Sequence, residues 1–188
     1  MEMKNDKIFL ERELSYLDRF VLKFVRILEK KKIDYVIVSG YIPILFGRSR
    51  GTEDIDILIK KLEYEEFEKF FEEMKGKFWC LNSENPKEIF KLLKETNARL
   101  AKINEIIPNI ELKFVRNEVE KLALKNKIRV DIKGKILYIS PIELQIVYKE
   151  DYLKSQKDKE DALHLRELFR NKLKANKIRE YKKLVKKL

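Results

Sequence analysis

The segment Asp54-Ile55-Asp56-Ile57-Leu58-Ile59 constrains the fold more than any other part of the sequence. Its alternation predicts a β-strand with the three isoleucines on one face, and with Asp54, Asp56 and Leu58 on the other. The isoleucine face needs a hydrophobic core, whereas two carboxylates side by side need solvent or a polar ligand. The chain is therefore expected to contain a strand on which two acids share one face.

A second strand and a turn precede this segment. Residues 34–39 are mostly apolar and β-branched and end at Ser39-Gly40, which predicts a buried strand that feeds a turn. Residues 41–46 are predicted to form a short helix with Ser39 as its N-cap. A basic loop at residues 47–52 then leads into the strand that carries the aspartates.

In the rest of the chain, apolar residues at three- and four-residue spacing predict helices, and short apolar or alternating runs predict strands. The predicted helices cover residues 7–31, 62–74, 87–95, 115–125, 140–153, 157–169 and 175–188. The predicted strands cover residues 78–81, 98–103, 110–115, 128–132 and 135–139, the last two as a hairpin. Because these elements alternate without a regular βαβ rhythm, we expect an α+β fold with a mixed β-sheet flanked by helices and a helical C-terminal part.

Length and composition limit the classes of protein to consider. A chain of 188 residues fits one domain, or one domain with a helical extension, and its net charge of +11 favours polyanionic partners. It contains neither the pattern of an export signal nor a run of about 18 uncharged apolar residues, so we expect a cytoplasmic protein without a membrane partner. The single Cys80 is predicted to be a buried strand thiol, and the single His164 a packing or surface residue, which leaves no zinc cluster.

Asp54 and Asp56 are candidates to bind divalent metal ions together. Alternate side chains of a strand point the same way, with Cα atoms about 6.5–7 Å apart, so both carboxylates can reach one site. Mg²⁺ prefers carboxylate and phosphate oxygens, and two such ions support in-line phosphoryl displacement. An isolated Asp-x-Asp can also be a solvated strand face, so the interpretation depends on its neighbours.

Those neighbours are typical of a phosphate site. Ser39-Gly40 ends a strand and begins a helix, where free N–H groups can bind a phosphate and a glycine allows its close approach. Arg48 and Arg50 lie between this turn and the aspartates, and guanidinium groups suit a triphosphate. The order of strand, turn, helix, basic loop and acidic strand therefore favours a site for a metal and a nucleoside triphosphate.

The residues Val38-Ser39-Gly40-Tyr41, followed by residues 47–56, resemble the nucleotidyltransferase superfamily that includes DNA polymerase beta. The similarity is greatest to minimal nucleotidyltransferases and to abortive-infection type toxins, which carry a Gly-Gly or Gly-Ser turn and an Arg-x-Thr-x-Asp-Ile-Asp stretch. A weaker resemblance to relatives of these toxins covers residues 139–144, Lys149 and residues 157–165. The resemblance implies a nucleotidyltransferase-like catalytic core with its N-terminal helix at residues 1–139, and a helical C-terminal region packed on it at residues 140–188.

The resemblance also implies roles for acidic residues. Asp54 and Asp56 would be catalytic and would bind Mg²⁺, two ions in all, while a nucleoside monophosphate moves from a triphosphate and pyrophosphate leaves. The family often adds a third carboxylate from a later strand. Glu111, on the predicted strand after Pro108, is our candidate for that catalytic and metal-binding residue, with Asp131 as the second choice.

Five further residues are expected to bind the nucleotide. Ser39 and Gly40 would hold the β- and γ-phosphates, although the family usually has glycine where this chain has Ser39. Arg50 and Thr52 would order their loop or contact the triphosphate. Lys149 is a candidate phosphate ligand, for which the alternative is a surface lysine on a Lys-rich helix.

The acceptor is left open by the sequence. We expect an RNA, such as a tRNA end, or a protein, because the net charge suits a macromolecular polyanion better than a small aminoglycoside-like alcohol. A toxin–antitoxin module with a partner protein encoded nearby would fit the same resemblance. The alternative is a catalytically silent module of this fold that binds RNA or an acidic protein.

The C-terminal residues 171–188 carry eight cations against the single acid Glu180. Such a segment could lie along RNA phosphates. It could equally be a packed terminal helix with a solvated lysine face.

Overall fold

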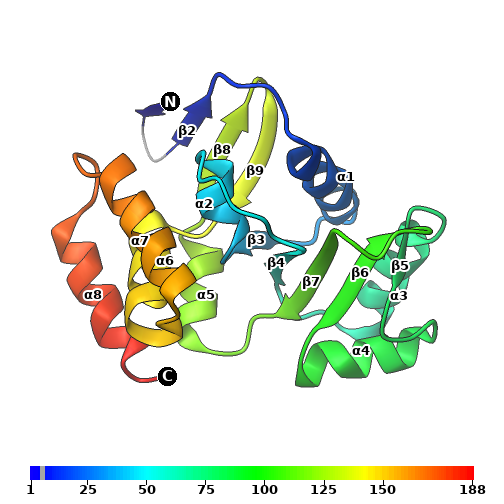
Figure 1. Cartoon of the computed structure of the whole chain (residues 1–188). Helices are drawn as coiled ribbons and strands as arrows, with labels where there is room; N and C mark the ends of the chain where they lie inside the picture. Colours follow the sequence, from blue (N-terminus) through cyan, green and yellow to red (C-terminus); the bar gives the residue numbers. More distant parts are fainter. Residues whose placement is uncertain (5–6) are drawn as a thin grey trace.

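The computed structural model describes residues 1–4 and 7–188, and in this part of the chain the strands form one nine-stranded mixed sheet (Figure 1). The strands follow the spatial order β1-β2-β8-β9-β3-β4-β7-β6-β5. Their bounds are β1 Glu2–Lys4, β2 Lys7–Leu10, β3 Tyr35–Val38, β4 Asp54–Ile59, β5 Phe78–Cys80, β6 Ala98–Lys102, β7 Asn109–Phe114, β8 Ile128–Ile132 and β9 Lys135–Ile139. The predicted α+β class with a mixed sheet flanked by helices is confirmed.

Helices cover both faces of this sheet. Their bounds are α1 Tyr16–Lys30, α2 Tyr41–Leu45, α3 Tyr64–Met74, α4 Pro86–Glu95, α5 Glu118–Lys125, α6 Ile142–Tyr148, α7 Gln156–Leu168 and α8 Ala175–Val185, with a π-helical turn η1 at Lys149–Leu153. Figure 1 shows α5 to α8 together on one side of the molecule and α3 and α4 on the other, beside β5 and β6. Among the described residues, none of the helices has the length and apolar character needed to cross a membrane.

The two faces of β4 behave as its alternation predicts. Ile55, Ile57 and Ile59 are fully buried in the larger core, which also contains residues of α1, α3 and α4. On the opposite face, Leu58 packs in a smaller core with residues of α5, α6 and α8, whereas Asp54 and Asp56 stay partly exposed. The strand therefore separates a hydrophobic core from a polar site.

The prediction of one helix over residues 7–31 is wrong in its first part. Lys7–Leu10 is strand β2, which pairs in parallel with β8 so that Ile8 lies opposite Val130. The helix α1 begins after Ser15, whose side chain and that of Asp18 form a capping box. Apolar residues at Ile8 and Leu10 fit both a strand and a helix, and only the pairing with a distant strand decides between them.

Two predicted helix starts are also displaced. Gly40, and not Ser39, is the N-cap of α2, and Ser39 has a left-handed backbone with φ 62°. Pro141, rather than Ser140, is the N-cap of α6, and that helix passes into the π-helical turn η1. The hairpin of β8 and β9 and the buried Cys80 are confirmed.

The buried carboxylate of Asp18 fixes helix α2, which follows the Ser39-Gly40 turn, against α1. It accepts a hydrogen bond from the Tyr41 hydroxyl at 2.5 Å and pairs with Arg12 at 2.6 Å. Arg12 also donates to the carbonyl of Leu45 at the end of α2. The turn is thus held in place by a polar network beneath it.

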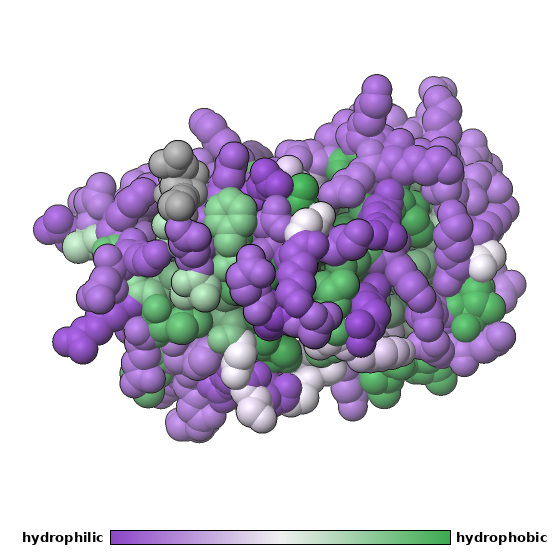
Figure 2. All heavy atoms as spheres, turned by 90° about the horizontal axis from the view of Figure 1, so that it is seen from above, coloured by the Kyte–Doolittle hydropathy of each residue, from purple (hydrophilic) through white to green (hydrophobic). Residues whose placement is uncertain are grey.

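The C-terminal helix α8 is packed rather than free. Tyr181 and Val185 are buried in the smaller core with α5 and α6. Of the lysines within α8, Lys183 is exposed, while Lys177 and Lys182 are half-buried, as expected for a packed amphipathic helix. Seen from above, hydrophilic side chains cover most of the molecule, with hydrophobic groups showing between them (Figure 2).

Candidate active site

The two aspartates of β4 lie on the polar face of the sheet. Thr52 in the preceding loop donates its hydroxyl to the Asp54 carboxylate at 3.1 Å and to the Asp54 carbonyl at 3.0 Å. Asp54 and Asp56 share one face because the strand is regular through both residues. The basic loop and the acidic strand are therefore joined by a direct hydrogen bond.

Strand β7 adds two charged residues to this face. It runs parallel to β4, with Glu111 opposite Asp56 and Lys113 opposite Leu58. Period-two alternation places Glu111 and Lys113 on the same face as the aspartates. The sheet thus brings Glu111, the predicted third acid, next to the pair.

The ammonium of Lys113 lies between two of these acids. Its Nζ atom is 2.7 Å from Asp56 Oδ1 and 3.1 Å from Glu111 Oε2. Burial raises the pKa of Asp56, although Lys113 opposes this shift. Burial alone would lower the pKa of Lys113, but its two acidic partners raise it, so the ammonium stays charged.

Glu111 has other partners besides Lys113. Its carboxylate accepts hydrogen bonds from Asn97 at 2.8 Å and from Arg99 at 3.0 and 3.2 Å. Burial would raise the pKa of Glu111, but Lys113 and then Arg99 and Asn97 hold it below its ordinary value. Glu111 is therefore an ionised acid in a fixed orientation beside Asp56.

The donor set suits magnesium bound through a substrate. In the described ranges 1–4 and 7–188, no three histidine, cysteine or acidic side chains are arranged so that they could hold a metal ion by themselves. Mg²⁺ commonly takes one or two carboxylates and completes its shell with phosphate oxygens and water. Asp54 and Asp56 fit that pattern, and Glu111 as a third ligand stays a prediction.

The Ser39-Gly40 turn faces the acids from the end of β3. The Ser39 amide donates to the side-chain oxygen of Gln145 in α6 at 2.9 Å. The left-handed backbone of Ser39 costs a non-glycine residue about 1–2 kcal/mol, which explains why a glycine would suit this position. The turn keeps its shape here because β3 and α6 hold it from both sides.

Gly40 is needed for space rather than for its backbone angle, since its φ of −67° is open to any residue. A Cβ atom at this position would overlap Nη2 of Arg50 and lie 3.6 Å from Thr52 Oγ1. The guanidinium therefore lies directly against the backbone of the turn. Its Nη1 atom is buried and, within the described chain, has no hydrogen-bond partner, which leaves a cationic donor for an anionic ligand.

A buried acid holds the basic loop in place. Asp161 of α7 is fully buried and lies 3.1 Å from Arg48 Nε, 3.2 Å from Arg50 Nε and 2.9 Å from Lys149 Nζ. One carboxylate thus faces three cations from two elements. It links the C-terminal helices to the loop that carries Arg50.

Lys149 belongs to this network. Its side chain is only 1% exposed, and its ammonium also pairs with Asp158 at 3.1 Å. The structure therefore places Lys149 beneath the loop, next to the carboxylate that Arg50 contacts. Its role as a direct nucleotide ligand stays a prediction.

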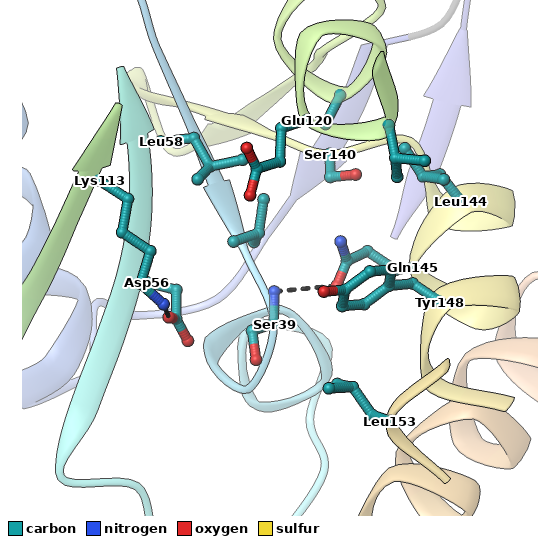
Figure 3. A pocket seen from close by; sticks show the side chains of 13 residues that line it. Ser39, Asp56, Leu58, Lys113, Glu120, Ser140, Leu144, Gln145, Tyr148 and Leu153 are labelled. Carbon is teal, nitrogen blue, oxygen red and sulfur yellow. Dashed lines mark hydrogen bonds and ion pairs between the residues drawn. The ribbon is translucent and has the colours of Figure 1, made fainter. Parts of the chain in front are cut away.

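A cavity of about 190 Å³ opens beside the turn and the acids (Figure 3). Ser39, Asp56 and Lys113 line one side, and Gln145 and Tyr148 of α6 face them across it. Burial raises the pKa of Tyr148 to about 12, so its hydroxyl is a donor at neutral pH. The remaining lining is mainly apolar: Val38, Leu58, Val119, Ala123, Leu144 and Leu153.

Three residues of the site were missed by sequence reasoning. Lys113 could have been found, since it lies two residues after Glu111 on an alternating strand. Gln145 had no local signal, because it reaches the site through the packing of α6. Asp161 lies in the segment 157–165 that carries the weaker resemblance, but no role was predicted for it. Asp131, the second choice for the third acid, lies on β8, which β9 and β3 separate from β4, about 14 Å away at the usual strand spacing.

His164 lies outside the acid cluster. Its Nε2 atom is 3.2 Å from the carbonyl oxygen of Phe46, so the ring contacts the end of α2.

Solved structures with the same fold are nucleotidyltransferase-like proteins. An antigenic nucleotidyltransferase-like protein from Paracoccidioides brasiliensis matches with a TM-score of 0.53 at 17% identity, over 79% of this chain and 74% of that one. The antibiotic-resistance factor ANT(2'')-Ia in solution matches with a TM-score of 0.52 at 13% identity, over 86% of both chains. Its crystal structure in complex with adenylyl-2''-tobramycin matches with a TM-score of 0.50 at 14% identity, over 89% and 95%.

By sequence, no protein-family model and no curated protein matches the chain. The resemblance is thus one of fold, and it confirms the predicted nucleotidyltransferase fold. Identities this low show the architecture and leave the reaction to be argued from the site.

The contact between Gly40 and Arg50 gives a first prediction. Gly40→Ala is expected to displace the Arg50 guanidinium and to weaken triphosphate binding about tenfold, because one charge-assisted hydrogen bond contributes about 1.5–3 kcal/mol. Titration with a non-hydrolysable triphosphate and Mg²⁺ would measure the change. Gly51→Ala is the matched control, since a Cβ there meets nothing within 4 Å; equal affinity loss in both variants would contradict the assignment.

Proposed function

We propose that the protein is a metal-dependent nucleotidyltransferase that moves a nucleoside monophosphate from a triphosphate to an acceptor hydroxyl and releases pyrophosphate. The observation that carries the proposal is the juxtaposition of Asp54 and Asp56 with the Ser39-Gly40 turn and the buried, partly unsatisfied guanidinium of Arg50. In the antiparallel pair of β3 and β4, Val38 lies opposite Asp56, so the turn follows the strand at the level of the acids.

The phosphate groups are assigned to the turn and the basic loop. Arg50 offers the free donor Nη1, while Thr52 is held by its hydrogen bond to Asp54. Ser39 and Gly40 supply the close backbone surface on which the β- and γ-phosphates would lie. Lys149 supports this arrangement through Asp161, and we propose that any direct contact of Lys149 with phosphate is secondary.

The metal ions are assigned to Asp54 and Asp56. Bound Mg²⁺ would neutralise the charge that develops on the phosphate oxygens during transfer. Lys113 already places one positive charge against Asp56, so the acids are oriented before a substrate arrives. Glu111 is the proposed third carboxylate and the candidate to accept the proton of the acceptor hydroxyl.

The reaction is an in-line displacement. The acceptor oxygen forms a bond to the α-phosphorus, and the bond from that phosphorus to the bridging α,β-oxygen breaks. Pyrophosphate leaves with its negative charge facing Arg50. The cavity between Ser39 and Tyr148 is large enough for one ring system, and we assign the nucleoside to it.

The acceptor is proposed to be a macromolecule, either RNA or a protein, in keeping with the net charge of +11. ANT(2'')-Ia, by contrast, has been solved with an adenylylated aminoglycoside. A place in a toxin–antitoxin module, with a partner protein, is part of the same proposal. The location is proposed to be cytoplasmic.

A second candidate function has one observation in its favour. Lys113 bridges Asp56 and Glu111 and so occupies both acids with a protein cation. If a metal ion does not displace this ammonium from the two carboxylates, the protein would be a catalytically silent module that binds RNA or an acidic protein.

One experiment separates the two candidates. The protein is incubated with Mg²⁺, each of four triphosphates labelled at the α-phosphate, and total RNA or total protein. Transfer of label that depends on Mg²⁺ and is lost in the Asp54→Ala variant supports the enzyme. No transfer from any triphosphate, together with retained RNA binding, overturns it in favour of the silent module.

A further inference from the structure

A basic groove runs along helix α1, away from the phosphate site. One hollow of about 490 Å³ lies between α1, the end of α3 and the first residue of β5, and a second hollow adjoins it, because both include Lys23 and Lys102. Together they are lined by six cations and a single acid, Glu73. The cations are Arg19, Lys23, Arg26, Lys30, Lys77 and Lys102.

The cations of α1 lie on one face of the helix. Arg19, Lys23, Arg26 and Lys30 are separated by four, three and four residues, and all four are exposed. Within the described part of the chain, no acid lies within 4.0 Å of the first three, and like charges at this spacing destabilise a helix. Such a row of like charges contributes no stability to helix α1 itself.

The far side of the groove is also positive. Glu73 pairs with Lys30 at 2.8 Å and with Lys77 at 2.9 Å, and these two cations lower the pKa of Glu73 to about 2. The one acid in the lining is thus already neutralised by two cations. Beside the lining, the Glu105 carboxylate pairs with Lys102 at 2.5 Å. The groove as a whole presents an excess of positive charge to a ligand.

The groove lies near the end of the sheet at which strand β4 begins. Asp54 pairs with Asn109 in β7, and Asn109 lies opposite Ala101 in β6. The next residue of β6, Lys102, lies opposite Phe78 in β5. At about 4.8 Å between neighbouring strands, the cationic end of the groove is about 10–15 Å from Asp54 along this edge.

Aromatic side chains stand where the groove reaches that edge. Tyr16 lines the second hollow, is 55% exposed and donates its hydroxyl to Glu105 at 3.0 Å. Trp79, on the opposite face of β5 from Phe78, is 36% exposed and donates its indole N–H to the Glu105 carbonyl at 2.9 Å. Exposed rings beside a cationic groove are the arrangement that binds single strands by stacking.

We propose that this groove binds a single-stranded nucleic-acid segment and leads its end around the sheet edge to Asp54, so that the bound strand is the acceptor. The statement about the acceptor rests on the proposed nucleotidyl transfer, whereas binding in the groove does not. A protein partner is a weaker match, because cations dominate the lining of the groove itself, and those of α1 form a row along it.

Binding is measured by fluorescence anisotropy of a labelled single-stranded RNA and a DNA of the same sequence, with the full chain and without triphosphate. The triple variant Arg19→Glu, Lys23→Glu, Arg26→Glu is expected to bind at least tenfold more weakly. Its slope of log affinity against log salt concentration should be smaller by about 2, because three phosphate contacts are lost at about 0.7 each. The strand type that binds more tightly is the expected acceptor.

The matched control carries the same charge change at exposed lysines at the end of α8 and directly after it: Lys183→Glu, Lys186→Glu, Lys187→Glu. This variant is expected to keep most of the affinity, and Tyr16→Ala is expected to weaken binding of the single strand more than of a duplex. Equal losses in the two triple variants, or no binding by the unaltered protein, would overturn the groove. If transfer fails but the groove variants still differ, the groove stands and the proposed enzyme activity falls.

Discussion

Asp54→Asn and Asp56→Asn are each expected to lower the rate of nucleotide transfer by about a thousandfold or more. Either change removes a negative charge that the proposed metal ions need, and metal ions contribute several kcal/mol to such reactions, at about 1.4 kcal/mol for each factor of ten. The measurement is single-turnover transfer of α-labelled nucleotide at saturating triphosphate and Mg²⁺.

The fold should survive both changes. Asparagine keeps the shape of the side chain, and Asp54 and Asp56 are partly exposed at the polar face of the sheet. Thermal unfolding of each variant provides the control. Transfer at an unchanged rate by a folded variant would remove that aspartate from the catalytic site.

Asp161→Ala is expected to lower the free energy of unfolding by about 3–5 kcal/mol, the usual effect of removing one partner from a buried ion pair. The variant leaves Arg48, Arg50 and Lys149 close together without the carboxylate that they share. Urea unfolding followed by circular dichroism would measure the loss.

Glu160→Ala is the matched control for that change. Glu160 also pairs with Arg48, at 2.8 Å, but its side chain is 50% exposed, and an exposed pair contributes about 0–1 kcal/mol. A loss for Asp161→Ala no larger than that for Glu160→Ala would contradict the central place of Asp161 in the network.

Strand β4 could be predicted because its signals are local. Alternation over residues 54–59 sets both the strand and the face of each side chain, and the hairpin of β8 and β9 has turn residues Lys133 and Gly134, both with positive φ. The site-bearing face then follows from geometry alone. Glu111 also follows, since β7 alternates in the same way.

The parts that could not be predicted depend on contacts between distant segments. β2 is a strand because it pairs with β8, more than 100 residues later, and its own four residues fit either class. Ser39 adopts a left-handed conformation because β3 and α6 hold the turn, against its own preference. Asp161 and Gln145 reach the site only after the C-terminal helices pack.

Gly40 illustrates a third case. The sequence predicts that Gly40 allows the approach of a phosphate. In the structure the same lack of a side chain makes room for Arg50, so Gly40 would also act on a bound phosphate through this neighbour. Sequence reasoning found the residue without finding its contact.

The most direct test of the account compares two labels on one triphosphate. With Mg²⁺ and the acceptor fraction that gives transfer, label from the α-phosphate should appear on the acceptor, label from the γ-phosphate should appear in pyrophosphate, and both should vanish in Asp54→Asn. Transfer of the γ-label to the acceptor would show phosphoryl rather than nucleotidyl transfer, and undiminished transfer of the α-label by Asp54→Asn would show that the acid pair is not catalytic.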